Sequence, residues 1–324
     1  MGLRKKYTFR KLGIQLLTTR RLIENPLYSF FYKRNIKKKT KSRMPVLLIE
    51  PTNACNANCR TCCRADMKRE IGFMPMGVYE KIVKDAVDMG VKSITLTGFG
   101  EPFMDPKIFE KIDIAKKHDL NVVIITNGSL IGKVGVEKIV NSGVDEISFS
   151  IDSVNKAFFE HIRRNLNYDV VEKNLMDLIK TRKSKKPIVS ITSVLIDRDF
   201  KRIKNVYRKF DKIVDYILVQ FSHNWTGKQN ELGSSSSGMK INKWPCPYLW
   251  WNLMIRWDGD VSLCCFDFDS KIVLGNVGRQ SLSDIWNGEK INKMRELHLN
   301  GEKGKVDICK GCSVYPNWWA DWSR

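Results

Sequence analysis

Cys55-Asn-Ala-Asn-Cys59-Arg-Thr-Cys62 is the stretch that organises this sequence of 324 residues. It follows the apolar run Val46-Leu47-Leu48-Ile49, and a fourth cysteine, Cys63, lies beside its end. Three thiolates on one short loop can hold an iron–sulfur cluster and leave one iron without a protein ligand, open to a substrate or cofactor. A zinc site needs a fourth ligand nearby, and the first histidine of the chain is His118. A buried structural cysteine group is the remaining alternative.

From Val46 onward, the sequence alternates between apolar runs and segments with helical spacing. The helical segments carry apolar stripes such as Val78, Ile82, Val83, Ala86 and Val87. This alternation predicts an α/β fold of right-handed βαβ units, with functional residues at the carboxyl ends of parallel strands. Periodicity alone does not separate a partial barrel from a doubly wound sheet. The expected strands are Val46–Glu50, Ser93–Thr97, Asn121–Thr126, Glu146–Ile151, Ile188–Ile196 and Tyr216–Phe221.

Motifs that could take part in binding or catalysis follow several of these strands. Gly98-Phe-Gly-Glu-Pro102 offers close backbone approach and a carboxylate that can receive an ammonium group. Asn127-Gly-Ser129 by itself indicates only a turn. Ser150 and Asp152 are two residues apart on a strand, so they are expected on one face. After the sixth strand, His223 and Asn224 are candidate substrate contacts.

Residues 244–324 are expected to form a C-terminal module after a flexible Gly/Ser-rich linker at residues 233–243. Trp257-Asp-Gly-Asp260 predicts a hairpin turn within the module. Four thiolates in two groups could bind structural zinc or hold a cluster, and spacing leaves both open. The module's five cysteines, out of nine in the chain, are Cys246, Cys264, Cys265, Cys309 and Cys312.

The cysteine loop and the strand-end motifs, in this order, resemble the radical S-adenosylmethionine (SAM) superfamily over roughly residues 44–315. The resemblance implies a partial (β/α)6 TIM-like barrel over residues 44–232. It also implies a [4Fe–4S] cluster on Cys55, Cys59 and Cys62, whose open iron takes the amino and carboxylate groups of SAM. Thr61 departs from the aromatic residue usual in the family. The SAM contacts implied are Gly100, Glu101, Asn127, Ser150, Asp152 and Arg163, with Arg164 competing for the last role.

The C-terminal module resembles the auxiliary-cluster extension of the same superfamily, in the SPASM/twitch subgroup. The full SPASM form has seven cysteines, so this chain resembles the shortened form with one auxiliary [4Fe–4S] cluster. Cys265 is spare. Four thiolate ligands would fill that cluster and suit it to electron transfer. The implied ligands are Cys246, Cys264, Cys309 and Cys312.

The charge of the chain is unevenly distributed. The formal net charge is +21, and residues 1–43 contribute +13 of it through 14 basic residues and one acid. This basic N-terminal arm is expected either to contact an anionic membrane surface or polyanionic substrate, or to act as a solvated linker. No run approaches the roughly 18 apolar residues that cross a bilayer. The expectation is a cytoplasmic protein, possibly peripheral to the inner face of the membrane.

The resemblance implies a radical SAM oxidoreductase that forms a 5′-deoxyadenosyl radical, abstracts a substrate hydrogen and passes an electron to the auxiliary cluster. The auxiliary cysteine spacing resembles that of aminocyclitol dehydrogenases, which favours a sugar- or cyclitol-like alcohol, possibly lipid-linked. Flavodoxin or ferredoxin is the expected electron donor. The alternatives are a peptide-modifying maturase, an epimerase, or a zinc-stabilised nucleic-acid-binding protein. Concentration of charge in the arm, rather than along a binding face, makes nucleic acid an unlikely partner.

Overall fold

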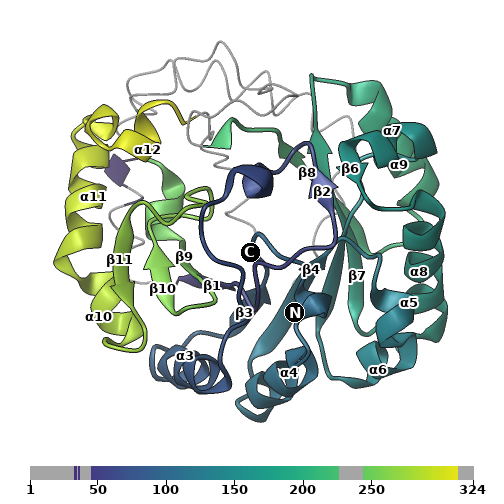
Figure 1. Cartoon of the computed structure of the whole chain (residues 1–324), viewed down its shortest axis with the longest axis horizontal. Helices are drawn as coiled ribbons and strands as arrows, with labels where there is room; N and C mark the ends of the chain where they lie inside the picture. Colours follow the sequence, from purple (N-terminus) through teal and green to yellow (C-terminus); the bar gives the residue numbers. More distant parts are fainter. Residues whose placement is uncertain (1–32, 35, 37–44, 226–243, 313–324) are drawn as a thin grey trace.

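A curved nine-stranded sheet with helices on its outer side forms the body of the protein (Figure 1). The computed structural model describes residues 33, 34, 36, 45–225 and 244–312. The strand order is β11-β10-β9-β1-β3-β4-β5-β7-β8, and a separate two-stranded ladder joins β2 to β6. The strands β11 and β8 end this order, so the described strands form an open, partial barrel rather than a closed one.

The six strands expected from the sequence form the parallel part of this sheet, each within one residue of the expected bounds at either end. Their aliphatic, β-branched composition suits strands that are covered on both faces. Their carboxyl ends meet at one edge, where the predicted site residues follow. The bounds are β1 Val46–Ile49, β3 Ser93–Leu96, β4 Asn121–Thr126, β5 Glu146–Ser150, β7 Ile188–Leu195 and β8 Tyr216–Phe221.

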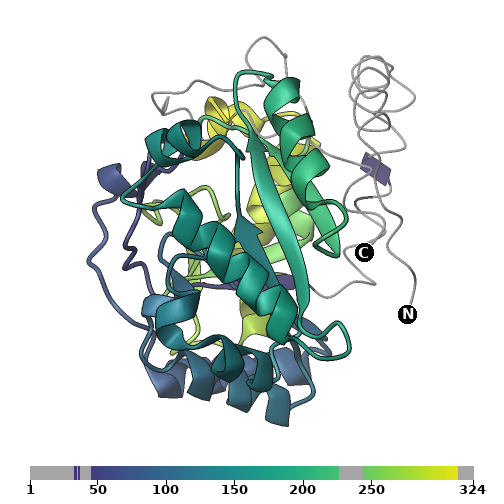
Figure 2. The ribbon, with the colours of Figure 1, turned by 90° about the vertical axis from the view of Figure 1, so that its right-hand side faces the viewer.

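The connecting helices lie on the outside of the sheet, as Figure 1 and the perpendicular view in Figure 2 show. In α3 the buried face is set by Tyr79, Ile82, Val83 and Ala86, whereas Val87 of the expected stripe is 41% exposed. The larger helices are α3 Met76–Asp88, α4 Ile108–Lys117, α8 Tyr168–Thr181 and α9 Phe200–Phe210; the shorter ones are α5 Ile131–Val134, α6 Val136–Asn141 and α7 Lys156–Ile162.

The C-terminal module continues the same sheet instead of standing apart from it. Strand β9 (Asn252–Ile255) pairs in parallel with β1, and the antiparallel strands β10 (Asp260–Ser262) and β11 (Val273–Asn276) follow. The expected turn falls between β9 and β10, where Gly259 has a φ of +87°. The module's helical segments are η4 Pro247–Trp250, α10 Leu282–Asn287, α11 Glu289–Leu299, η5 Lys303–Lys305 and α12 Asp307–Lys310.

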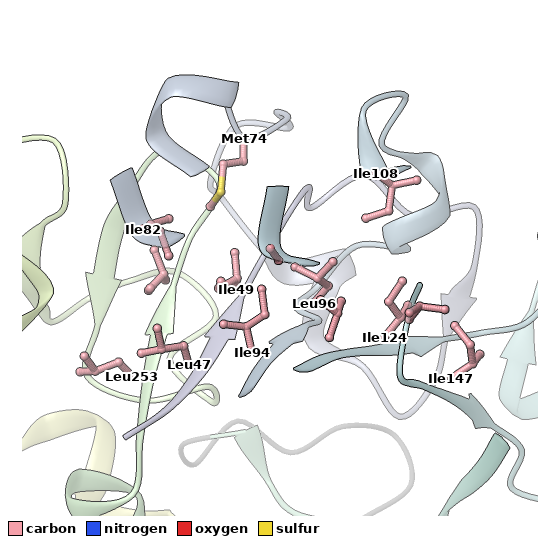
Figure 3. Packing of buried hydrophobic residues seen from close by; sticks show 14 of the residues in the cluster. Leu47, Ile49, Met74, Ile82, Ile94, Leu96, Ile108, Ile124, Ile147 and Leu253 are labelled. Atoms are coloured by element: carbon pink, nitrogen blue, oxygen red, sulfur yellow. The ribbon is translucent and has the colours of Figure 1, made fainter. Parts of the chain in front are cut away.

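One hydrophobic core runs beneath both parts of the chain. Leu253 of β9 lies in the same layer as Leu47 of β1 and Ile94 of β3 (Figure 3). Ile36, the one buried residue described in the N-terminal arm, is 1% exposed and belongs to this cluster. Ile36 therefore packs on the barrel.

Several expectations concern residues outside the described ranges. They are the linker at 233–243, nearly all of the basic arm at 1–43, and the end of the C-terminal module after residue 312. Within the described ranges, no helix combines the length and apolar character that a bilayer crossing would require.

Candidate active site

The three-cysteine loop begins at the carboxyl end of β1 and is held by side chains that precede it. The Thr52 hydroxyl donates to the carbonyl of Gly72 (2.7 Å) and accepts from the backbone N–H of Ala54 (3.0 Å). Asn53 donates to the carbonyl of Glu70 and accepts from the N–H of Gly72, both at 2.8 Å. These bonds join the start of the loop to the segment that follows it.

The loop is also paired with a distant part of the chain. Strand β2 (Asn58–Cys59) forms an antiparallel ladder with β6 (Arg163–Arg164), and Cys59 is opposite Arg163. A backbone bond from Arg60 to the carbonyl of Ile162 (2.8 Å) extends this pairing. The predicted arginine is therefore brought directly to the predicted cluster ligands.

The three predicted thiols lie close enough to influence one another's charge. Burial raises the pKa of Cys55, and it raises the pKa of Cys59 to about 12 although the guanidinium of Arg163 opposes this. A hydrogen bond from the Cys63 thiol lowers the pKa of Cys62. Buried, mutually repelling thiolates require a compensating charge, which an iron–sulfur cluster supplies.

Gly100 allows the second motif to approach the cysteine loop. A Cβ at this position would lie 2.2 Å from the carbonyl oxygen of Thr52, and the N–H of Glu101 donates to the carbonyl of Ala54 (2.8 Å). No side chain larger than hydrogen fits this contact without a shift of backbone. The two loops are thus packed against each other along their main chains.

The carboxylate of Glu101 is fully buried and joins the ends of β3 and β4. It accepts from the Thr126 hydroxyl (2.7 Å), the Asn127 N–H (2.7 Å) and the Phe103 N–H (3.2 Å). Burial raises its pKa to about 7 against these hydrogen bonds. Two donors bind Oε1 and one binds Oε2, so Oε2 keeps an acceptor position for the predicted SAM ammonium.

Asn127 locks the cysteine loop to the end of β4. Its Nδ2 donates to Oδ1 of Asn56, and Nδ2 of Asn56 donates to Oγ of Ser129, both at 2.8 Å. The Asn127 Oδ1 in turn accepts from the N–H and hydroxyl of Ser129. A motif that indicated only a turn in the sequence is therefore a positioning element for the loop.

Asp152 and Arg163, both predicted SAM contacts, form a buried ion pair at 2.9 Å. The other oxygen of Asp152 accepts from the N–H of Val194 (2.8 Å). Arg163 is buried while Arg164 is exposed, which favours Arg163 between the two candidates. Ser150 is half-buried at the end of β5, opposite Thr192 of β7.

The auxiliary cysteines come together from three separate parts of the C-terminal module. Burial raises the pKa of Cys264, and the charges of Cys265, Cys309, Cys246 and Cys312 raise it further. The pKa of Cys246 is likewise raised to about 11 by burial. All four predicted ligands and the spare Cys265 are therefore within electrostatic reach of one another.

The chemistry of the donor set agrees with iron–sulfur clusters. Both predicted sites offer cysteine thiols, which are the ligands that hold such clusters. Three thiols lie on the loop after β1, and the C-terminal module supplies the other four predicted ligands.

The segment after β8 bridges the two cysteine sites. Nε1 of Trp225 donates to the carbonyl of Thr61 (2.8 Å), and Nδ2 of Asn224 donates to the carbonyl of Gly311 (2.7 Å). The centroid of the His223 ring lies 3.9 Å from the ring centroid of Phe266 and 4.4 Å from that of Trp225. Burial lowers the pKa of His223 to about 3, so the imidazole is neutral.

Comparison with known protein families identifies the superfamily of this chain. The radical SAM superfamily matches residues 49–210, and an iron–sulfur cluster-binding domain called SPASM matches residues 246–313. This chain belongs to the radical SAM superfamily. It is a radical SAM enzyme with a SPASM domain, which implies a SAM-binding [4Fe–4S] cluster and auxiliary iron–sulfur chemistry. The comparisons give no support to the zinc-stabilised nucleic-acid-binding alternative.

Radical SAM relatives with different names share parts of the chain. The tungsten-containing aldehyde ferredoxin oxidoreductase cofactor-modifying protein of Pyrococcus furiosus is 26% identical over 322 aligned residues, covering 84% of this chain and 88% of the relative. The SAM-dependent 2-deoxy-scyllo-inosamine dehydrogenase of Niallia circulans is 44% identical over 55 residues, which cover 17% of this chain and 22% of the relative.

Solved structures share the fold at low identity. BtrN in complex with AdoMet and 2-DOIA is 18% identical, with a TM-score of 0.61 over 84% of this chain and 94% of that one. SuiB of Streptococcus suis, bound to the precursor peptide SuiA, is also 18% identical, with a TM-score of 0.67 over 84% of this chain and 72% of that one. Both agree with a radical SAM fold followed by a C-terminal module.

The sequence missed one group of residues at this edge of the sheet. Glu50 and Arg256 are buried, Arg69 is partly buried, and both arginines pair with Glu50 between the two cysteine sites. An acid directly after an apolar strand was a visible signal for Glu50. Arg256 carried none, because its position depends on β9 pairing with β1.

Proposed function

We propose that this radical SAM enzyme oxidises a secondary alcohol of a small polar substrate to a ketone. The observation that carries the proposal is the gathering of Cys246, Cys264, Cys309 and Cys312. Four thiolates would complete the ligand set of one auxiliary [4Fe–4S] cluster, which then has no open iron for substrate. Such a cluster is suited to accept an electron, and alcohol oxidation by a radical route requires an acceptor.

When bound and reduced, SAM would supply a 5′-deoxyadenosyl radical that could abstract the hydrogen of the alcohol carbon. The auxiliary cluster would accept the electron that must leave, together with the hydroxyl proton, to give the ketone. The protein positions these parts. Glu101, Asp152 and Arg163, which are predicted SAM contacts, would hold SAM beside the cysteine loop. His223 and Asn224 lie between the two cysteine sites, and they stay predicted substrate contacts.

Two observations favour a cyclitol- or sugar-like alcohol. A local match of 44% identity joins this chain to a 2-deoxy-scyllo-inosamine dehydrogenase. The chain also covers 94% of the BtrN structure but 72% of the peptide-bound SuiB structure. A peptide-modifying activity is the second candidate, because the SuiB fold gives the higher of the two TM-scores.

The test is product stoichiometry in an anaerobic assay with SAM, a chemical reductant and a panel of aminocyclitols, sugars and peptides. We expect one ketone per 5′-deoxyadenosine from an alcohol substrate. In deuterium oxide, an oxidation leaves the substrate carbon without label. Deuterium incorporation into a recovered, inverted alcohol would instead establish epimerisation. Turnover of peptides alone would replace the alcohol proposal with the maturase.

The partners and location follow as further proposals. Flavodoxin or ferredoxin would supply the first electron, and the basic arm at residues 1–43 would bind a lipid-linked substrate or the anionic inner face of the membrane. Full-length protein should sediment with vesicles that contain anionic lipid, and protein lacking residues 1–43 should not. Equal sedimentation of the two proteins would refute the membrane role of the arm.

A further inference from the structure

Buried Glu50 and Arg256, together with partly buried Arg69, form a charged group between the two cysteine sites. Glu50 follows β1 and Arg256 follows β9, and the N–H of Glu50 donates to the carbonyl of Ile255 (2.9 Å), so the two stand side by side. Arg69 binds both oxygens of Glu50, at 2.9 and 3.0 Å. Nη1 of Arg256 lies 3.6 Å from the same carboxylate. One carboxylate thus faces two guanidinium groups, and the charge of Asp267 also acts on Arg256.

Arg256 is directed at the loop that carries an auxiliary cysteine. Its Nη2 donates to the carbonyls of Asp267 (2.6 Å) and Cys264 (3.4 Å), and its Nε donates to the Ser262 hydroxyl (2.7 Å). The residue is 0% exposed, and Nη1 has no hydrogen-bond partner among the described residues. Its charge also lowers the pKa of the Cys265 thiol, against the larger effect of burial. A fixed cation therefore lies against the backbone of a predicted cluster ligand.

Lys303 places a second buried cation at this site. It lies in η5 and is 2% exposed. The backbone joins η5 to Cys309, because the N–H of Val306 donates to the carbonyl of Lys303 (3.1 Å) and the N–H of Cys309 donates to the carbonyl of Val306 (2.8 Å). In agreement with this position, the charge of Lys303 opposes the rise in pKa that burial causes at Cys246 and Cys309. The negative charge of Asp267 acts in the opposite direction and raises the pKa of Cys309. The Asp267 carboxylate already accepts hydrogen bonds from two backbone N–H groups, both at 2.9 Å. Cations thus flank the auxiliary thiols from two separate elements.

We propose that Arg256 and Lys303 are positioning residues that raise the reduction potential of the auxiliary cluster. Reduction adds negative charge to a cluster, and a nearby cation in a medium of low dielectric constant stabilises the reduced form. The two residues would therefore make the auxiliary site a better electron acceptor. This inference rests on the proposed function, because it assumes that the four thiols hold a cluster which takes an electron.

The test is an anaerobic redox titration of the two-cluster enzyme, in which electron paramagnetic resonance follows each cluster. In R256Q we expect at least a tenfold lower ratio of reduced to oxidised auxiliary cluster at a fixed potential, a shift of about 59 mV for one electron. K303Q should shift the ratio in the same direction. R256K, which keeps the charge, should restore most of the wild-type ratio.

Arg295 provides a matched control in the same module. It is 5% exposed, holds the carbonyls of Leu249 and Trp286, and also has one guanidinium nitrogen without a described partner. No cysteine contributes to the shift of its pKa, which burial alone lowers. R295Q should therefore leave the auxiliary potential unchanged. An equal shift in R295Q would attribute the effect to general loosening and overturn the inference.

The outcomes separate the inference from the proposed function. About eight irons with unchanged potentials in both R256Q and K303Q would refute the tuning role and leave the electron acceptor in place. About four irons and no second signal in the wild type would refute the auxiliary cluster itself, and the proposed function with it. If R256Q does not retain its cluster, K303Q and R256K still decide the question.

Discussion

The two cysteine sites of this molecule are built in opposite ways. Cys55, Cys59 and Cys62 lie on one loop, which neighbouring strand ends fix through Asn127 and the β2–β6 ladder. The auxiliary cysteines lie on segments up to 66 residues apart and meet only when the C-terminal module folds. The first site is encoded locally and the second by tertiary structure. The first should therefore tolerate loss of the second better than any disruption of its own loop.

The largest expected effect comes from removing each cysteine set. C55A/C59A/C62A should hold about four irons instead of about eight and lose SAM cleavage entirely, because the SAM-binding iron is gone. C246A/C264A should also lose about four irons but still cleave SAM without forming ketone. Iron content and 5′-deoxyadenosine are the measurements. Loss of SAM cleavage in both variants would show that the sites are not independent.

The next effect concerns the buried ion pair beside the first site. R163M leaves Asp152 buried without its partner, which typically costs about 3–5 kcal/mol of unfolding free energy. R164M alters the exposed neighbour and should change stability by less than about 0.5 kcal/mol. Denaturant unfolding and calorimetric SAM binding should both separate the two variants. Similar losses in R163M and R164M would contradict the assignment of Arg163.

Glu101 should make stability depend on pH near the first site. Its pKa rises from 4.5 to about 7 on folding, so the folded state holds a proton that the unfolded state releases in this window. Raising the pH from about 4.5 to about 7 should therefore cost about 3 kcal/mol. Buried His223 and His298, with lowered pKa values, give an opposite slope. The measurement is the free energy of unfolding of the wild type minus that of E101Q, which should fall by that amount as the pH rises.

A smaller effect is expected from the close contact at Gly100. In G100A the added methyl would sit 2.2 Å from the Thr52 carbonyl, and such overpacking costs about 1–3 kcal/mol. Iron at the first site should fall while auxiliary iron stays. G77A is the control, because nothing lies within 4 Å of that Cβ and Ala favours helix α3 by up to about 1 kcal/mol. Full iron content in G100A would mean that the loops can separate without loss of the site.

The smallest expected effect is that of changing Cys265, and its comparison with Cys264 tests the ligand assignment of the second site. C265S should keep the iron of the wild type, because the four other thiols complete the cluster. C264S should lose auxiliary iron, since its position follows β10 and its carbonyl is held by Arg256. Iron counts and the auxiliary spectrum compare the two. The reverse result would exchange the roles of Cys264 and Cys265.

The sequence predicted the six parallel strands of the barrel, for physical reasons. Runs such as Asn121–Thr126 are apolar and β-branched, as strands covered on both faces require. Arg163 and Arg164 could not be separated, because only the register of β6 against β2 decides which one is buried. The parallel pairing of β9 with β1 was missed, since no local pattern encodes a partner about 200 residues away.

That pairing also bears on how the chain reaches its native state. Strand β1 pairs with β3 on one side and β9 on the other, and closing a loop of this length is a late and slow event in folding. During synthesis, β1 therefore presents an unpaired edge until residues 252–255 have emerged, and such edges promote aggregation. Strand β9 of the C-terminal module pairs with that edge and removes it from solvent. A fragment cut before Cys246 should accumulate as insoluble protein rather than as a free-standing SAM-binding domain.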